Sequence, residues 1–194
     1  PNLRAGQIYV RHPPADIVER VARTCLLEPR VDLVIWKRSL TMVDPPGNIV
    51  AGPRGQLEFW RAEDAPAATS AHDAFGQLWS WQGDLETLAV DRSDGSVAFS
   101  EYPNAFERIA GALDARHSGE LWVTAQPGCE FEVPGNGAHV GGGSHGALHA
   151  LDSLSPMIVA GAPRRLPRAL RSVGIAPLCL EGLGMGMRYG VGDA

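Results

Sequence analysis

A histidine in a glycine-rich segment is the residue of this 194-residue chain best suited to chemistry. Residues 141–146 have the sequence Gly-Gly-Gly-Ser-His-Gly, and a short apolar segment follows at residues 155–160. Glycine adopts sharp, positive-φ turns, so His145 can be directed into a cleft from a loop at the edge of a strand. One interpretation of His145 is a metal ligand, because imidazole is a common zinc ligand. The other is a loop histidine that is solvated or hydrogen-bonded.

The elements on either side of this loop have the periodicity of an α/β protein. Apolar residues at helical spacing predict helices over residues 15–25 and 105–116, and a short terminal helix that ends at Gly184. Strands are predicted at residues 7–11, 31–36, 120–125 and 155–160. The last two strands are apolar at successive positions, so we expect both in one sheet that is covered on both faces.

The middle of the chain has a different pattern. Strands are predicted at residues 55–60, 84–90 and 96–100, with a turn over residues 91–95. We expect these strands to form a separate antiparallel insert, packed by Trp60, Trp79 and Trp81. The expected organisation is an α/β segment of the catalytic domain at residues 1–44, the insert at 45–103 and a C-terminal α/β segment at 104–194.

Several blocks between residues 119 and 184 resemble the alkaline phosphatase superfamily, in its nucleotide pyrophosphatase/phosphodiesterase-like branch. The blocks are Glu-Leu-Trp-Val-Thr-Ala-Gln-Pro-Gly at 120–128, Ser-His-Gly-Ala-Leu-His at 144–149, Asp-Ser-Leu-Ser-Pro at 152–156 and Arg-Ser-Val-Gly-Ile-Ala-Pro at 171–177. Gly174 and Leu178 replace the aspartate and threonine that are common in the family ending. The resemblance implies an α/β fold, an alkaline-phosphatase-like sandwich with a central, mainly parallel sheet and helices on both faces.

The resemblance also implies a metal site. His145 becomes a ligand of one ion in a two-metal centre, with Zn²⁺ as the expected ion and other divalent ions as alternatives. His149 and His139 flank the loop. Each either contacts a phosphate group of the substrate, hydrogen-bonds to a metal ligand, or faces solvent. Asp152 either accepts a hydrogen bond from an imidazole or caps a turn, and Ser144 is expected to be a turn residue.

No catalytic nucleophile is expected in this segment. The family's Asp-x-x-x-His and Ser-Asp-His-Gly ligand motifs have no match in the sequence either. We therefore expect the chain to be the C-terminal portion of a metal-dependent hydrolase of phosphate mono- or diesters, inactive by itself. The alternative is a non-catalytic α/β domain whose glycine-rich loop binds an anion or a protein partner through backbone amides.

Composition limits which partners and which cellular compartment are expected. A net charge of −5 provides no basic field for nucleic acid, and no apolar run is long enough to span a bilayer. The expected partner is a small phosphate ester. Three widely spaced cysteines argue against a disulfide framework and a thiolate zinc site. We expect a cytoplasmic location, with a periplasmic or secreted one as the alternative.

Overall fold

The computed structural model of the protein describes residues 4–11, 15–38, 47–63, 69–132, 135, 142–161 and 170–185. It divides the chain into two compact units, Pro1–Leu154 and Ser155–Ala194. The first unit contains the sheet and the hydrophobic core clusters of the described residues, and the second contains helix α4 (Ile175–Gly182).

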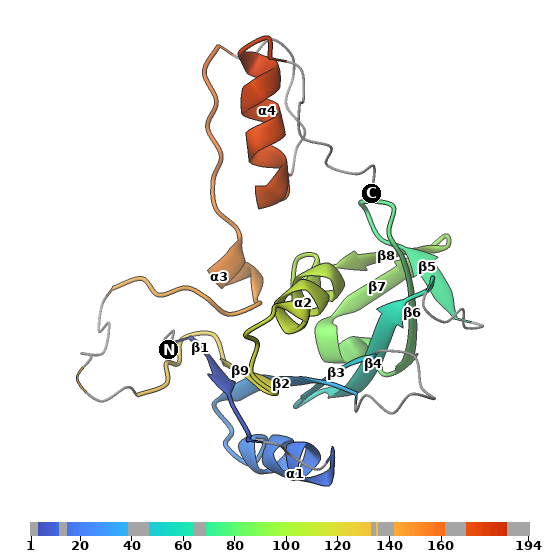
Figure 1. Ribbon diagram of the computed structural model, residues 1–194, viewed down its shortest axis with the longest axis vertical. Helices are drawn as coiled ribbons and strands as arrows, with labels where there is room; N and C mark the ends of the chain where they lie inside the picture. Colours follow the sequence, from blue (N-terminus) through green and yellow to red (C-terminus); the bar gives the residue numbers. More distant parts are fainter. Residues whose placement is uncertain are drawn as a thin grey trace. The chain divides into compact units, whose positions relative to one another are not determined.

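The described part of the first unit forms one nine-stranded sheet (Figure 1). The strand order is β1-β9-β2-β3-β4-β6-β5-β8-β7. Neighbouring strands are antiparallel except β5 and β8, which are parallel. The strands are β1 (Ala5–Ile8), β2 (Val31–Lys37), β3 (Asn48–Gly52), β4 (Gly55–Arg61), β5 (Ser70–His72), β6 (Leu78–Gly83), β7 (Val90–Ser93), β8 (Ser96–Phe99) and β9 (Leu121–Ala125).

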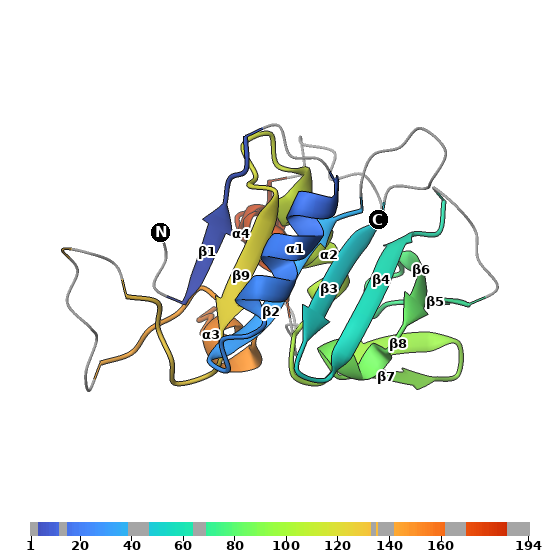
Figure 2. The same cartoon turned by 90° about the horizontal axis from the view of Figure 1, so that it is seen from below.

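Helix α1 (Ala15–Cys25) packs on one face of the sheet, over β9 and β2 (Figure 2). Val34 and Trp36 of β2 belong to the cluster on this face, and Val18 and Val21 of the helix pack against it. Ala22 is fully buried between them. The predicted helix is confirmed, because its apolar residues recur at the 3.6-residue spacing that places them on one face.

Helix α2 (Ala105–Asp114) packs on the opposite face, against the cluster that contains Leu33 and Ile35 of β2. The Phe106 ring stacks on Phe59 with the ring centroids 4.2 Å apart and meets Trp79 edge-on at 5.5 Å. The predicted apolar face is buried as expected: Phe106, Ile109, Ala110 and Leu113.

The predicted mainly parallel sheet with helices on both faces is wrong, because the observed sheet is mostly antiparallel and few helices accompany it. The parallel arrangement came from the family resemblance, and the apolar run at residues 120–125 supported only a sheet covered on both faces. Strand β2 has the same burial, since six of its seven residues are buried. Here α1 and α2 produce the same apolar pattern around antiparallel strands, so the pattern did not report strand direction.

The predicted insert is not separate from the main sheet. Strand β3 pairs with β2 and β4 pairs with β3, so the strands of residues 45–103 continue the same sheet. The expected strand at residues 84–90 is largely a 3₁₀ helix, η1 (Leu85–Leu88). Its first turn is capped by Asp84, whose carboxylate accepts from the Glu86 amide at 2.9 Å, and this local bond competes with strand pairing.

The expected buried strand at residues 155–160 is also wrong. These six residues are exposed and have no strand structure, and Ile158 is 93% exposed. The terminal helix is confirmed as α4, and Gly184 follows it with φ +69°. The Met185 amide bonds to the Leu180 carbonyl, which closes the helix as a glycine C-cap does.

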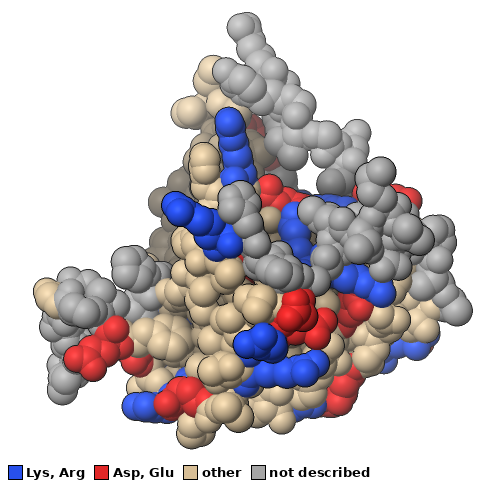
Figure 3. Space-filling model, turned by 60° about the horizontal axis from the view of Figure 1, so that its bottom comes forward, with Lys and Arg blue, Asp and Glu red and all other residues tan. Residues whose placement is uncertain are grey.

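Charged side chains of both signs are interspersed on the face shown in Figure 3. Within the described residues, no helix is long and apolar enough to cross a membrane.

Candidate functional site

His145 lies in the irregular segment between β9 and the short helix α3 (Ala150–Ser153). The backbone turns beside it at Gly146, which adopts φ +116°, a conformation that favours glycine. The His145 side chain is exposed, and no described residue hydrogen-bonds to it. Ser144, beside it, is half-buried. The imidazole is therefore accessible to an external ligand.

The residues that follow His145 are held firmly. Ala147 and Leu148 are buried, and Leu148 belongs to the core cluster beneath α2. Arg108 of α2 donates to the Leu148 carbonyl at 2.9 Å and to the Ser153 hydroxyl at 2.8 Å. Burial lowers the pKa of Arg108, and nearby Asp152 opposes that shift.

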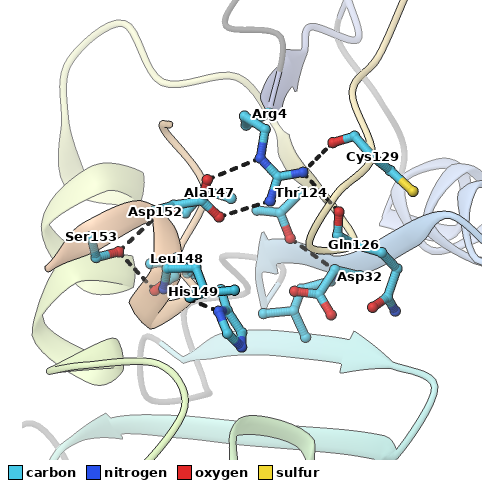
Figure 4. A network of polar contacts seen from close by, with 12 residues as sticks. Arg4, Asp32, Thr124, Gln126, Cys129, Ala147, Leu148, His149, Asp152 and Ser153 are labelled. Atoms are coloured by element: carbon cyan, nitrogen blue, oxygen red, sulfur yellow. Dashed lines mark hydrogen bonds and ion pairs between the residues drawn. The ribbon is translucent and has the colours of Figure 1, made fainter. Parts of the chain in front are cut away.

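A buried ion pair fixes α3 to the other end of the chain (Figure 4). Arg4 donates to the two carboxylate oxygens of Asp152, from Nε at 2.9 Å and from Nη2 at 2.8 Å. Its Nη1 also donates to the backbone carbonyls of Gln126 and Cys129. Hydrogen bonding to Asp152 raises the pKa of Arg4. One guanidinium thus joins the β9 end of the loop to the helix that closes it.

His149 caps the amino end of α3. Its Nδ1 accepts from the Leu151 amide at 3.2 Å (Figure 4), so the neutral ring carries its proton on Nε2. The ring meets Tyr102 edge-on with the centroids 5.5 Å apart. This contact places His149 in the wall of a pocket.

The pocket has a volume of about 320 Å³. Its wall is formed by Asp32, Leu33, Pro53, Arg54, Thr87, Glu101, Tyr102, Gln126, Pro127 and His149. Asp32 is buried, and the Tyr102 hydroxyl lies 3.0 and 3.1 Å from its two carboxylate oxygens. Burial raises the pKa of Asp32 above its usual value, and the bond from Tyr102 opposes that shift. Burial, with the nearby Asp32 charge, also raises the pKa of Tyr102.

Strand irregularity and a tight turn bring the polar groups of this pocket together. The pairing of β2 with β9 shifts register between Val31 and Leu33, where Asp32 lies, and such bulges re-aim side chains. Arg54 lies in the turn between β3 and β4. It forms an ion pair with Glu101 at 2.9 Å and donates to the Tyr102 hydroxyl at 3.3 Å.

The structure places the candidate site residues predicted from the sequence in different surroundings. His145 and Ser144 lie on the accessible loop, His149 lines the pocket, Asp152 pairs with Arg4 and not with an imidazole, and His139 lies outside the described residues. Sequence reasoning missed Arg4, Arg108, Tyr102 and Asp32. Only Asp32 left a signal, as a single carboxylate within the apolar run Val-Asp-Leu-Val-Ile-Trp.

The part of the chain that the structure describes contains no group of three His, Cys, Asp or Glu side chains arranged to hold a metal ion. Its three cysteines are free thiols. His145 fits the role of a single accessible ligand, but these residues do not complete a metal centre. No protein-family model, curated protein or solved structure matches the chain.

Proposed function

We propose that this chain is the C-terminal portion of a metal-dependent hydrolase of phosphate mono- or diesters, to which it contributes His145 as a metal ligand. The support is the resemblance of the glycine-histidine loop and its flanking blocks to metal-ligand segments of the alkaline phosphatase superfamily. The mostly antiparallel sheet gives that resemblance no support. The proposal therefore depends on the loop.

One structural observation carries the proposal. The His145 imidazole is exposed and unpaired among the described residues, while the chain just after it is buried and bound to Arg108. A ligand must be accessible, yet it must keep its position when the metal binds, because an imprecisely held ligand weakens the site. A loop anchored a few residues beyond an accessible imidazole satisfies both requirements.

The remaining ligands and the nucleophile are proposed to come from residues outside the printed sequence. Bound zinc would polarise a phosphoryl oxygen and lower the pKa of a coordinated water. The part assigned to this chain is limited: His145 presents an imidazole nitrogen, while Arg4 and Arg108 position its loop.

The test uses the longest natural polypeptide that contains residues 1–194. We expect it to bind zinc stoichiometrically and to hydrolyse p-nitrophenyl phosphate or bis(p-nitrophenyl) phosphate. His145→Ala should lower kcat by about 100-fold or more and lose zinc, since even partners of metal ligands contribute 10- to 100-fold. The matched control is His117→Ala, at another exposed histidine, which should leave both quantities unchanged.

Residues 1–194 alone should show neither turnover nor stoichiometric zinc, because the described part offers one ligand where a catalytic zinc takes three. Wild-type zinc content and activity in His145→Ala would overturn the proposal. A zinc-free long polypeptide that binds inorganic phosphate through residues 142–146 would support the non-catalytic alternative.

A further inference from the structure

The pocket around Asp32 contains a buried carboxylate that the proposed hydrolase chemistry does not use. Asp32 is 4% exposed. A carboxylate offers about four acceptor positions, and the Tyr102 hydroxyl has one proton to share between the two oxygens. No other described residue donates to this carboxylate. Asp32 therefore keeps most of its acceptor capacity unused.

The pocket's own cation does not neutralise Asp32. Arg54 forms its ion pair with Glu101, and its guanidinium lies 5.6 Å from the centroid of the Tyr102 ring. Burial raises the pKa of Asp32 more than the nearby charges of His149 and Arg54 lower it, so these two residues only partly offset the cost of burying the carboxylate. A buried carboxylate that forms no ion pair with a described residue is costly, and binding a cation from outside would offset that cost.

A second polar group in the wall also lacks a partner. Thr87 is 1% exposed, and its hydroxyl oxygen has no hydrogen-bond partner among the described residues. Buried hydroxyls are normally satisfied, so an unsatisfied one in a pocket wall indicates a ligand or an ordered water. Thr87 lies on η1, which is distant in sequence from Asp32, so this observation is independent of the carboxylate.

We propose that this pocket binds a small organic ammonium ion, with the ammonium group at Asp32. An ammonium carries a positive charge and three donors, which match the unused acceptor positions of Asp32 and the Thr87 hydroxyl. Leu33, Pro53 and Pro127 provide apolar wall for a short carbon chain. An inorganic metal ion fits less well, because the described residues form no three-ligand group. An anion fits less well because the arginine is already paired.

The location of Asp32 agrees with this role. It lies where β2 loses register with β9, and bulges of this kind are frequent beside binding sites. The wall places Tyr102, His149, Arg54 and Glu101 around the carboxylate, so each contributes to its charge state.

Binding can be measured on the isotope-labelled chain by amide chemical shifts at pH 7.5. The probe is n-propylammonium, and 1-propanol and propionate are the neutral and anionic probes of similar size. We expect saturable shifts at the amides of the pocket residues with propylammonium, and at least tenfold weaker responses to the other two. An equal response to 1-propanol would overturn the proposal.

The decisive variant is Asp32→Asn, whose amide oxygen can still accept from Tyr102. It should weaken propylammonium binding at least tenfold, while the exposed matched control Asp91→Asn should not change it. Unchanged affinity in a folded Asp32→Asn chain would overturn the proposal. If that variant does not fold, the isosteric Thr87→Val decides: at least threefold weaker binding supports the site, and unchanged binding overturns it. His145 is not involved, so these outcomes are separate from those of the hydrolase proposal.

Discussion

Arg4 and Asp152 form a buried ion pair that joins two segments far apart in the sequence. Their side chains are 4% and 3% exposed, and they lie 148 positions apart in the sequence. Removing water from two charges is costly, and the cost is recovered only where geometry is good and further hydrogen bonds are made. Arg4 meets that condition, because it donates to both carboxylate oxygens of Asp152 and also to two backbone carbonyls. The pair therefore fixes where the histidine loop ends.

Asp32 has the opposite energetic character. Burial raises its pKa above the usual value of 3.8, so the folded protein binds a proton at this site more tightly than the unfolded chain does. Across the interval between the unfolded and folded pKa, the folded state holds more protons, and the free energy of unfolding falls as the pH rises. Asp32 therefore stabilises the fold least when it is ionised.

We predict that Asp32→Asn gains stability relative to wild type as the pH rises. The asparagine is always neutral, so the two proteins should have similar free energies of unfolding below pH 4, and the variant should be the more stable at pH 7. Urea unfolding at both pH values measures the difference, and the comparison cancels the other titrating groups. The prediction would be contradicted if the free energy of unfolding of wild type rose relative to that of the variant as the pH rises. A residue that costs stability but binds a ligand is a familiar compromise.

At the scale of elements, the apolar segment at residues 155–160 is where the structure and the family resemblance differ most. The resemblance requires a buried strand, whereas the structure exposes Met157, Ile158 and Val159 by 41%, 93% and 44%. Burying an isoleucine contributes on the order of 2–5 kcal/mol when measured by truncation. A single substitution can therefore distinguish the two arrangements.

We expect Ile158→Ser to change the free energy of unfolding of the 194-residue chain by no more than about 0.5 kcal/mol, as exposed substitutions do. Urea unfolding followed by tryptophan fluorescence reports on the sheet, which contains the buried Trp79 and Trp81. Ile35→Ser, in the fully buried part of β2, serves as the positive control and should lose several kcal/mol. A comparable loss in Ile158→Ser would mean that the segment is buried as the resemblance requires.

At the scale of the whole molecule, the hydrophobic clusters of the described residues lie in the first unit. Both hydrophobic clusters consist of residues no later than Leu148, and the helix that follows them ends at Ser153. The second unit contains α4, and none of the described residues of that helix is buried. Among the residues that the structure describes, the core of the sheet is therefore formed by the first unit.

We predict that a chain ending after Leu154 unfolds at the same urea midpoint as residues 1–194. The matched control ends after Cys129, which removes Leu148 from the core and Asp152 from its contact with Arg4. Removing a buried leucine side chain alone costs about 2–5 kcal/mol, so the control should be strongly destabilised. A large loss in the Leu154 truncation would show that the second unit supports the sheet.

The sequence alone determined the elements whose pattern is local. The helical spacing of Val18, Val21 and Ala22 defined α1, and the same argument defined α2 and its buried face. The turn predicted over residues 91–95 is confirmed only at Asp94 and Gly95, which adopt φ +48° and +76°, the positive values that a two-residue hairpin turn requires, and residues 91–93 belong to β7. These features depend on neighbours within a few positions, so a single sequence contains the information.

Only the tertiary structure decided which strands pair, in which direction, and which polar groups meet. An apolar run such as β2 is compatible with a parallel or an antiparallel sheet, because burial does not depend on strand direction. The 155–160 run shows that apolar character alone does not place a segment in a sheet, since pairing also needs a partner edge. The contacts of Arg4 with Asp152 and of Asp32 with Tyr102 join residues far apart in the chain, and no spacing rule connects them. They form because folding brings charged groups into a low-dielectric interior, where each must find a partner.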